Sequence, residues 1–436
     1  MTKAPARIDA QQLKRKLMRS NTSLLLTGVM LFQFAAMLLL TLKKSPFDLQ
    51  AFSMALALPV ASYIVTMGAS RIWHVDRALM IMMLFLCSVS LVTLQDIARD
   101  PITPLTQAQH MGLGLIAMVM GIEFIRRIRA WEKWTLPLAI LAFVALLTPM
   151  LPGMGRTING ARNWIKIAGQ MIQPSEFVKM GLIVILAAGL SNRPSLKKSL
   201  PFLLMAAAYC AILLAERDLG AVLLYFLTTM CLYFVATGNW LVTLSGLGAG
   251  GIGGYLAFKA FPYVANRFDL FINPWTDPQD KGYQIVQALI AIGAGGAFGM
   301  GLGLGYPRNI PLYHSDFVFA ALSEAFGLIF AVGLLCIYAL IIMRGISIAM
   351  NARQSFHALV AFGYVTLLGC QALIIVGGNI KMIPLTGVTL PFISAGGSSI
   401  ISMMGGMGML LGISSINAVD EVEDLRRLEW REEARL

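Results

Sequence analysis

The sequence predicts an all-α polytopic membrane protein with about twelve transmembrane helices. Of its 436 residues, 57% are apolar and only 13% are charged, and the mean hydropathy is +0.73. A soluble domain is about one quarter charged. The apolar content also excludes a disordered chain, and five cysteines in this length exclude a disulfide scaffold. Lipid is therefore the expected surrounding of most of the chain.

Apolar stretches long enough to cross about 30 Å of hydrocarbon recur along the chain. An even number of spans places both termini on one side of the membrane. We expect twelve spans, near residues 22–42, 50–70, 78–95, 110–125, 134–152, 174–191, 199–215, 219–237, 240–260, 316–343, 354–378 and 391–413.

The distribution of Lys and Arg sets the predicted orientation. Loops on the side of the termini hold 21 of the 34 Lys and Arg residues, and the opposite side holds 12. Basic residues are enriched in cytoplasmic loops. We therefore expect both termini in the cytoplasm and residues 1–20 as a cytoplasmic arm. The net charge of +12 then reflects orientation, and we expect no nucleic-acid partner.

Two external segments, residues 153–173 and 261–315, are too long and too patterned to be simple connectors. Function concentrates in such loops. Within the second segment, residues 283–292 predict a short amphipathic or re-entrant helix, which a glycine-rich stretch follows. Residues 416–436 predict a cytoplasmic amphipathic tail.

The stretch from Gly248 to Gly253 matches a dinucleotide-binding pattern letter by letter. It lies inside an apolar span with no strand before it, so close helix packing by small residues explains it better. The five cysteines also fall inside apolar runs, and none is spaced like a metal ligand.

Several cations lie close to a helix start near the predicted outer surface. Arg162 and Lys166 flank Trp164, and Glu176 occupies the first turn of the next span, where a carboxylate stabilises a helix. Lys179 lies about one turn inside that span, where a charge is costly and indicates function or a specific partner. Snorkelling to the surface is the alternative for both lysines.

Glu216, Arg217 and Asp218 lie at the outer junction of two spans. An Arg between two carboxylates predicts an internal ion-pair cluster. The expected role of this cluster is structural.

The most informative stretch contains His314, Asp316 and Glu324. Asp316 opens an apolar helix at the external face, so it is either the helix N-cap or a group exposed to a surface substrate. Glu324 lies eight residues later, about 12 Å deeper along a helix. The two carboxylates therefore cannot act as an adjacent acid and base, and we expect Glu324 to be satisfied inside the bundle.

A segment broken by Pro and Gly, residues 384–399, returns to the outer face and includes Ser398 and Ser399. Broken backbone at membrane depth is tolerated where it lines a cavity. Lys381 stands at the entrance of this segment. Cations from three loops, Arg162, Lys179 and Lys381, together predict an external anion-binding site.

These stretches resemble the SEDS family of shape, elongation, division and sporulation proteins, which includes FtsW, RodA and SpoVE. The resemblance covers residues 75–415 and implies a SEDS-type bundle. Its ten-helix core would be residues 71–415, with an added arm and hairpin in residues 1–70 and a tail in 416–436. The matching motifs are residues 159–179, 216–220, 273–278 with 282–284, 299–305, 314–319 with Glu324 and Gly327, and 384–399.

The resemblance implies a peptidoglycan glycosyltransferase of the bacterial cytoplasmic membrane. Such an enzyme polymerises lipid II on the outer face and works with a class B penicillin-binding protein. Asp316 would then be the catalytic base, and Arg162 and Lys179 would handle the lipid pyrophosphate. The full set of substrate-binding candidates is Arg162, Lys179, Lys381, Ser398 and Ser399, and the supporting candidates are Trp164, Glu176, Glu216, Arg217, Asp218, His314 and Glu324.

Three positions depart from the family's pattern. Leu312 replaces the usual Glu of its Leu-Pro-Glu motif, and Ala395 replaces the Tyr of its Ser-Tyr-Gly-Gly motif. Asn163 precedes Trp164, where Arg is frequent. The expected fold is unaffected, while the substrate contacts at these positions differ from the usual ones.

The expected reaction joins a lipid-linked glycan to the 4-hydroxyl of lipid II and releases undecaprenyl pyrophosphate in one inverting displacement. We expect no dedicated cofactor, and Mg²⁺ or Mn²⁺ would be shared with the substrate pyrophosphate. A transporter that flips lipid II is the main alternative, but charges gathered at the outer face favour chemistry there. A scaffold for division or elongation proteins leaves Lys179 and Glu324 unexplained.

Overall fold

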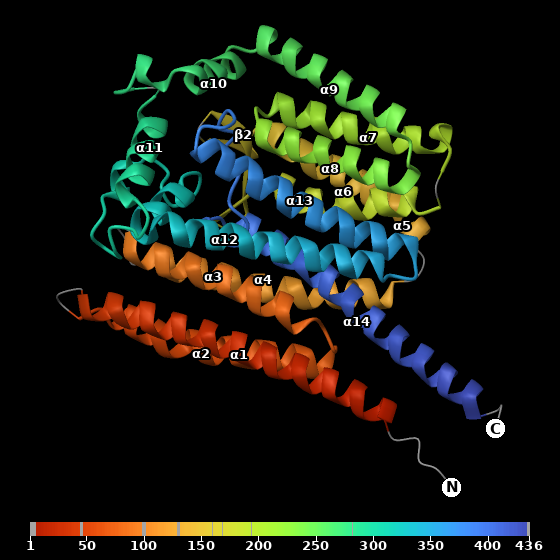
Figure 1. The fold of residues 1–436 in the computed structure, drawn as a ribbon. Coiled ribbons are helices and arrows are strands. Elements are labelled where there is room, and N and C mark those ends of the chain that lie inside the picture. The colour runs from red at the N-terminus through yellow and green to blue at the C-terminus, as the bar shows by residue number, and fades with distance from the viewer. Residues whose placement is uncertain are drawn as a thin grey trace.

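The computed structural model describes residues 6–43, 47–97, 102–128, 131–158, 160–167, 169–192, 194–280 and 282–433. This part of the chain contains fourteen α-helices and one small sheet (Figure 1). The helices are α1 (Ala6–Lys43), α2 (Leu49–Ile72), α3 (Arg77–Ile97), α4 (Ile102–Arg127), α5 (Trp131–Leu147), α6 (Pro174–Leu190), α7 (Leu196–Ala215), α8 (Leu219–Thr237), α9 (Trp240–Ala260), α10 (Pro262–Ile272), α11 (Tyr283–Gly295), α12 (Val318–Met350), α13 (Ser355–Asn379) and α14 (Gly397–Glu433).

Eleven helices of the described part are long and apolar enough to cross a membrane. The position predicted for a twelfth span, 174–191, is taken by α6, whose 17 residues cover about 25 Å. The predicted bundle is confirmed, and the chain is a multi-pass membrane protein. The span expected at 391–413 begins later, because residues 391–396 form turns before α14.

The packing of α4 against α14 depends on glycine. A Cβ at Gly121 would lie 2.3 Å from the backbone oxygen of Gly405, and a Cβ at Gly408 would lie 2.0 Å from that of Met118. Real atoms do not approach so closely. Small residues therefore let these two backbones touch, as membrane helices commonly do.

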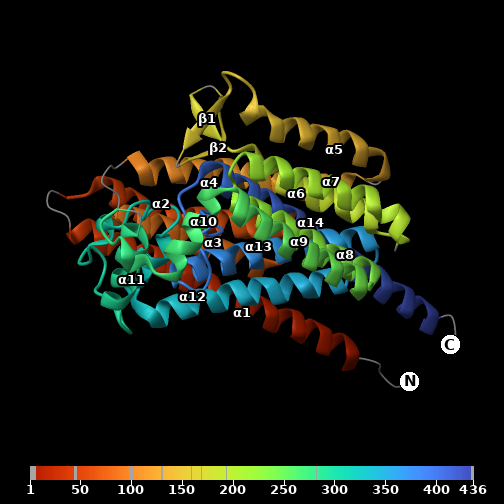
Figure 2. The ribbon, with the colours of Figure 1, turned by 90° about the horizontal axis from the view of Figure 1, so that it is seen from above.

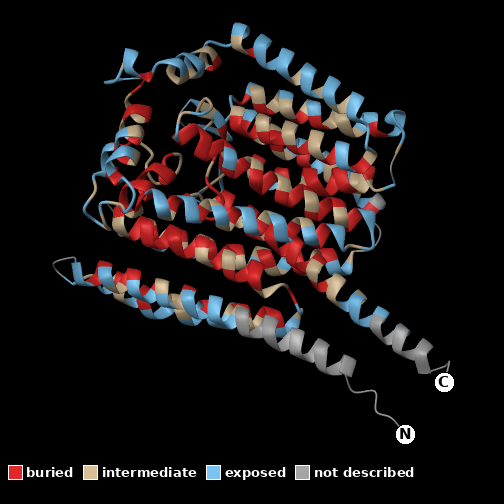
Figure 3. Cartoon of the chain, in the orientation of Figure 1, coloured by how far each residue is buried: buried red, intermediate tan, exposed pale blue. Residues whose placement is uncertain are grey.

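Burial is uneven across the bundle (Figure 3). The spans of α3, α13 and α14 are mostly buried, whereas α9 is exposed along its length. The dinucleotide pattern lies inside α9, which follows a helix and not a strand. The packing interpretation is confirmed at Gly250, which faces the Phe226 ring of α8, but Gly248, Gly251 and Gly253 have no neighbouring atom within 4 Å.

The first external segment forms a three-stranded antiparallel sheet, so the all-α prediction is wrong there. Asn163 and Ile165 are buried while their neighbours along the strand are half-buried or exposed, which is the period of two that a strand requires. Gly160 (φ 82°) and Gly169 (φ 85°) supply the positive φ of the two turns. The strands are β1 (Gly155–Ile158), β2 (Ala161–Ile167) and β3 (Gln170–Ile172).

Seen from above, the sheet, α10 and α11 lie toward one end of the bundle (Figure 2). The short helix predicted at 283–292 is confirmed as α11, which buries Ile285 and Ala288 against Phe317 at the start of α12. The first residues of α1 and the last residues of α14 lie at the opposite end of the bundle (Figure 1). The external segments are therefore gathered on one side.

α12 is broken at Gly327, whose φ of 81° and ψ of 174° are not helical. Two amides that would complete helical bonds across the break donate instead to the glycine-rich loop. Leu328 N donates to Gly296 O at 2.9 Å, and Ile329 N donates to Ala297 O at 3.2 Å. The loop thus occupies the break and separates a short outer part of α12 from a long inner part.

We expect Gly408→Ala to lower the free energy of unfolding by about 1–3 kcal/mol, because the new methyl group must displace the α4 backbone. Gly251→Ala is the matched control, since nothing lies within 4 Å of that position on α9. It should leave stability unchanged or raise it by up to about 1 kcal/mol. Chemical unfolding of the purified protein in detergent measures both values, and equal losses would contradict the prediction.

Candidate functional site

Lys179 lies inside the bundle, with only 2% of its side chain exposed. Its Nζ lies 2.5 Å from Glu176 Oε2 and donates to Gln371 Oε1 at 3.0 Å. Ser402 also donates to Glu176, at 3.3 Å. The snorkelling alternative is therefore wrong for Lys179, which has the polar partners that a charge at this depth requires. Lys166 is exposed on β2.

Asp218 joins three elements at the end of the bundle that holds the sheet. Its Oδ1 accepts from the Ala221 amide at 3.0 Å and so caps α8. Its Oδ2 accepts from Asn163 of β2 at 2.8 Å and from Gln173, just before α6, at 3.0 Å. Burial raises the pKa of Asp218, and the bonds from Ala221 and Asn163 partly lower it. The unusual Asn163 therefore contacts this carboxylate.

The predicted ion-pair cluster of Glu216, Arg217 and Asp218 is wrong. Arg217 has a φ of 66° and places its guanidinium carbon 5.5 Å from the ring centre of Tyr263. Glu216 is buried, and its backbone oxygen accepts from Arg162 N at 3.0 Å. Burial, together with the nearby Asp218 charge, raises the pKa of Glu216 to about 8. A left-handed backbone at the central residue separates side chains that are adjacent in sequence.

Arg162 is exposed on β2, and its Nη2 donates to Leu151 O at 3.2 Å. Adjacent residues of a strand point to opposite faces. Because Asn163 points inward to Asp218, Arg162 points away from the buried charges. Trp164 is half-buried on the same strand. The predicted convergence of three cations is therefore wrong at Arg162.

Residues 380–396 run as irregular backbone between α13 and α14. The broken segment predicted at 384–399 is therefore confirmed up to residue 396, and residues 397–399 are already in α14. Lys381 is half-buried there, with a φ of 59°, and donates to Ile272 O at the end of α10 at 3.3 Å. This contact ties the irregular segment to the second external segment.

Ser398 and Ser399 are both buried at the start of α14. The Ser398 hydroxyl accepts from Gln173 N at 3.0 Å, and the Ser399 hydroxyl shares a 2.7 Å hydrogen bond with Thr389. Both hydroxyls are therefore engaged by the protein, which differs from the predicted substrate contacts.

Asp316 is half-buried in a turn that precedes α12. The N-cap alternative is wrong, because Phe317 is the N-cap residue and makes no side-chain capping bond. Asn379 Nδ2 donates to Asp316 O at 2.8 Å and holds the turn against the end of α13. Burial raises the pKa of Asp316, while the Ser315 hydroxyl and the Arg267 charge lower it.

Arg267, on α10, is a site residue that the sequence does not single out. Its Nη1 donates to Leu385 O at 2.8 Å, and its guanidinium interacts electrostatically with both Asp218 and Asp316. Burial lowers the pKa of Arg267, and the two carboxylates raise it. Its only signal was membership in the long external segment 261–315, because α10 is too short to be predicted from an apolar span.

A cavity of about 30 Å³ lies beside these charges, and its lining includes Glu176, Lys179, Asp218 and Gly387. Gly387 has a φ of 76°, and a Cβ there would lie 3.6 Å from Asp316 Oδ2. The structure therefore brings Glu176, Lys179 and Asp218 together and places Asp316 behind Gly387. Of the three predicted cations, only Lys179 lines this cavity.

Glu324 is buried against the glycine-rich loop, and its Oε1 accepts from Tyr306 N at 2.9 Å. The prediction that Glu324 is hydrogen-bonded inside the bundle is confirmed for Oε1. Its Oε2 has no hydrogen-bond partner among the described residues. His314 accepts a hydrogen bond from Ala395 N at 2.8 Å through its backbone oxygen, and burial lowers the pKa of its imidazole. His314 thus holds the turn that contains Asp316.

Unusual backbone conformations gather at the same end. Of the five described non-glycine residues with positive φ, four lie in the loops around this site, namely Arg217, Leu312, Lys381 and Phe392. Such conformations cost energy and cluster at functional sites.

Metal-binding groups are not assembled in the described part of the chain, where no group of three His, Cys, Asp or Glu side chains is placed to hold an ion. The oxygens of Glu176 and Asp218 already accept bonds from Lys179 and from amide groups. These residues do not fit a metal cage. A divalent cation carried by the substrate stays a prediction.

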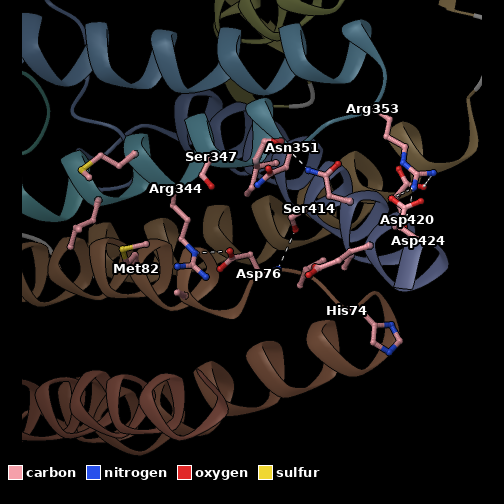
Figure 4. Close-up of a pocket in the computed structure, with 18 of the residues that line it drawn as sticks. His74, Asp76, Met82, Arg344, Ser347, Asn351, Arg353, Ser414, Asp420 and Asp424 are labelled. Carbon is pink, nitrogen blue, oxygen red and sulfur yellow. Dashed lines mark hydrogen bonds and ion pairs between the residues drawn. The ribbon is translucent and has the colours of Figure 1, made fainter. Parts of the chain in front are cut away.

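A separate cavity of about 1150 Å³ opens near the opposite end, between α1, α3, α12 and α14 (Figure 4). Arg344 lies 2.5 Å from Asp76 there, and Arg353 pairs with Asp420 and Asp424. No predicted site residue lines this cavity. Its arginines are paired within the protein, so its size does not indicate the site of chemistry.

The sequence matches the model of a family described as cell cycle proteins, FtsW/RodA/SpoVE, over residues 69–418. It is 35% identical to a probable peptidoglycan glycosyltransferase FtsW from Geobacter sp. (strain M18) over 71% of this chain and 86% of that protein. It is 36% identical to stage V sporulation protein E of Bacillus subtilis (strain 168), with the same coverage of both chains.

Solved structures are also similar. One similar chain comes from a structure described as the structural coordination of polymerization and crosslinking by a peptidoglycan synthase complex. Its TM-score is 0.67 and its sequence identity is 28%, over 79% of this chain and 98% of that one. The rod shape determining protein RodA of Thermus thermophilus has a TM-score of 0.59 and 28% identity, with the same coverage. From the motifs, the bundle and these matches, the chain belongs to the FtsW/RodA/SpoVE family of cell cycle proteins.

Proposed function

We propose that this chain is a peptidoglycan glycosyltransferase that polymerises lipid II into glycan strands on the outer face of the bacterial cytoplasmic membrane. The names of its relatives support the activity. The observation that carries the mechanism is the position of Asp316, which interacts electrostatically with Arg267 and lies next to Gly387, a residue that lines the same cavity as Lys179. An acid and cations lie together there at the end of the bundle that holds the external segments.

In the proposed reaction, Asp316 removes the proton from the 4-hydroxyl of lipid II. The oxygen then bonds to the anomeric carbon of the lipid-linked glycan, and the bond from that carbon to the pyrophosphate breaks. Undecaprenyl pyrophosphate leaves as the anion, and the anomeric centre inverts. A general base must come within about 3 Å of the proton-bearing oxygen.

The surroundings of Asp316 suit a base. Burial raises its pKa from the ordinary value, which strengthens it as a proton acceptor, and the Arg267 charge limits that rise. The Arg267 charge thus favours the ionised form of the Asp316 carboxylate. Arg267 interacts electrostatically with both Asp218 and Asp316, and we assign its positive charge to an approaching diphosphate.

Lys179 is the cation that we assign to the leaving pyrophosphate. It lines the cavity together with Ser175, whose hydroxyl is buried and has no hydrogen-bond partner among the described residues. A buried hydroxyl without a partner needs water or a ligand oxygen. Arg162, which is exposed on the sheet, would meet a pyrophosphate only outside the cavity.

We propose cytoplasmic termini and a class B penicillin-binding protein as partner. The excess of basic residues in the loops on the side of the termini supports this orientation. The similarity to a chain of a structure described as a peptidoglycan synthase complex supports a partner that cross-links strands. Mg²⁺ or Mn²⁺ would arrive with the substrate phosphates.

Asp316→Asn should lower the rate of glycan polymerisation by about 10²- to 10⁴-fold, because a general base contributes this much. Asp269→Asn, an exposed carboxylate of α10, is the matched control and should keep the wild-type rate. The assay uses lipid II and the purified protein with its transpeptidase partner. Equal strand formation by both variants would remove Asp316 from the chemistry. Passage of lipid II across sealed vesicles without polymer would favour the flippase alternative.

Arg267→Gln should shift the acidic limb of the pH profile of kcat/KM toward higher pH. The Arg267 charge lowers the pKa of Asp316, so its loss raises that pKa. Since the working base is the deprotonated carboxylate, activity then fails at a higher pH as the medium is acidified. Arg267→Lys keeps the charge and should retain the limb near its wild-type position. An unchanged limb in Arg267→Gln would contradict the coupling.

Lys179→Met should lower both stability and turnover, because it leaves Glu176 as a largely buried carboxylate without its ion-pair partner. The double variant Glu176→Gln, Lys179→Met removes that unpaired charge. It should recover the thermal stability while polymerisation stays on the order of 10²-fold low, the loss expected for an absent electrostatic donor. Recovery of both would show that Lys179 is only structural.

A further inference from the structure

The hairpin of α1 and α2 precedes most of the residues that match the family, yet it is firmly attached to the core. It lies along α3 (Figure 1). Gln33 of α1 is buried and donates both to Ser62 of α2 at 2.8 Å and to Ser88 of α3 at 2.6 Å. Near the outer end, Gln95 of α3 donates to Asp48 at 2.8 Å. These bonds fix the position of the hairpin relative to α3.

Lys43, at the end of α1, extends from the hairpin to the glycine-rich loop. Its Nζ donates to the backbone oxygen of Leu302. A Cβ at the next residue, Gly303, would lie 2.9 Å from Lys43 Nζ and 3.1 Å from Asp96 Oδ1 of α3. Because Gly303 has a φ of 67° and no side chain, the turn fits between these two charged groups. The hairpin therefore supplies one of the two charged groups that enclose the turn.

The loop in turn replaces hydrogen bonds that α12 loses at its break. Across Gly327, the backbone oxygens of Glu324 and Ala325 lack their helical donors. Met300 N donates to Glu324 O at 2.8 Å, and Gly301 N donates to Ala325 O at 3.0 Å. A shift of the loop would leave these oxygens unsatisfied, which is costly inside a membrane protein. The loop therefore sets the direction of the short outer part of α12.

We propose that the hairpin braces this loop and that Lys43 is a positioning residue for the reaction. Lys43 holds residues 302–303 and the loop holds the break at Gly327. The outer part of α12 begins at Val318, two residues after Asp316. The inference depends on the proposed role of Asp316 as the base. It gives a function to residues 22–72, most of which lie outside the family match.

The expected effect of removing Lys43 is moderate. Lys43 is an exposed side chain, and a single exposed polar contact contributes little to global stability. Its loss should therefore loosen the loop without unfolding the bundle. Local opening of this kind is measured by hydrogen exchange, which reports on individual segments.

The first experiment compares Lys43→Met with Lys43→Arg and with Lys259→Met in the full chain. Lys259 is the matched control. It also lies in the last turn of a peripheral spanning helix, but within the described part of the chain its Nζ lies over the rings of Tyr255 and Phe258 of its own helix. Exchange of the amides of residues 296–306 and 328–329 should rise about fivefold in Lys43→Met. It should stay near the wild-type value in the other two variants.

The second readout is glycan polymerisation by the same proteins. If Lys43 positions the base, Lys43→Met should lower kcat about fivefold with KM for lipid II unchanged within about twofold, and Lys43→Arg should restore most of kcat. If the amides of residues 296–306 and 328–329 exchange at the wild-type rate in Lys43→Met, the hairpin does not brace the loop, whatever the role of Asp316. Faster exchange with a wild-type kcat would overturn the positioning role. Failure of the base assignment appears separately, as normal polymerisation by Asp316→Asn.

Discussion

The carboxylate of Asp218 holds together the end of this protein that carries the sheet. It accepts hydrogen bonds from the start of α8, from β2 and from the residue before α6, and it interacts electrostatically with Arg267 of α10. A buried carboxylate without donors would be strongly unfavourable. The three elements must therefore converge on it, and their convergence places Lys179, on the second turn of α6, against the cavity.

Asp316 is positioned by backbone contacts and by one amide side chain. Asn379 holds its turn from α13, and residues 314–315 are bonded to the irregular segment 380–396 through Ala395 N and the Ser394 hydroxyl. Backbone oxygens are available whatever the residue type. The substitution of the family's Tyr by Ala395 is therefore compatible with this contact, since only the Ala395 amide takes part.

Much of the architecture could be predicted, because long apolar stretches have few possible structures in lipid. The spans and the short helix α11 follow from this constraint, and the cost of an intramembrane charge correctly indicated that Lys179 has specific partners. The sheet could not be predicted from apolar length. Its strands are short, and their period of two appears only when the burial of residues such as Asn163 is known.

The errors at the site have a common physical cause. Both predictions ignored the backbone geometry. A positive φ directs Arg217 onto Tyr263 and not onto its neighbouring carboxylates. The alternation of β2 turns Arg162 away from the cavity that Lys179 lines. Arg267 reaches Asp316 across about fifty residues of chain. Such long-range pairing depends on the path of α10, which local sequence patterns do not contain.

The break in α12 also bears on how the protein fits its membrane. The inner part, from Leu328 to Met350, is about 35 Å long and is sufficient to cross the hydrocarbon with some tilt. A thicker or thinner bilayer is accommodated by changing the tilt of such a helix. Because Gly327 lies between this part and the turn of Asp316, the length of α12 that is matched to the bilayer ends at the break and excludes that turn.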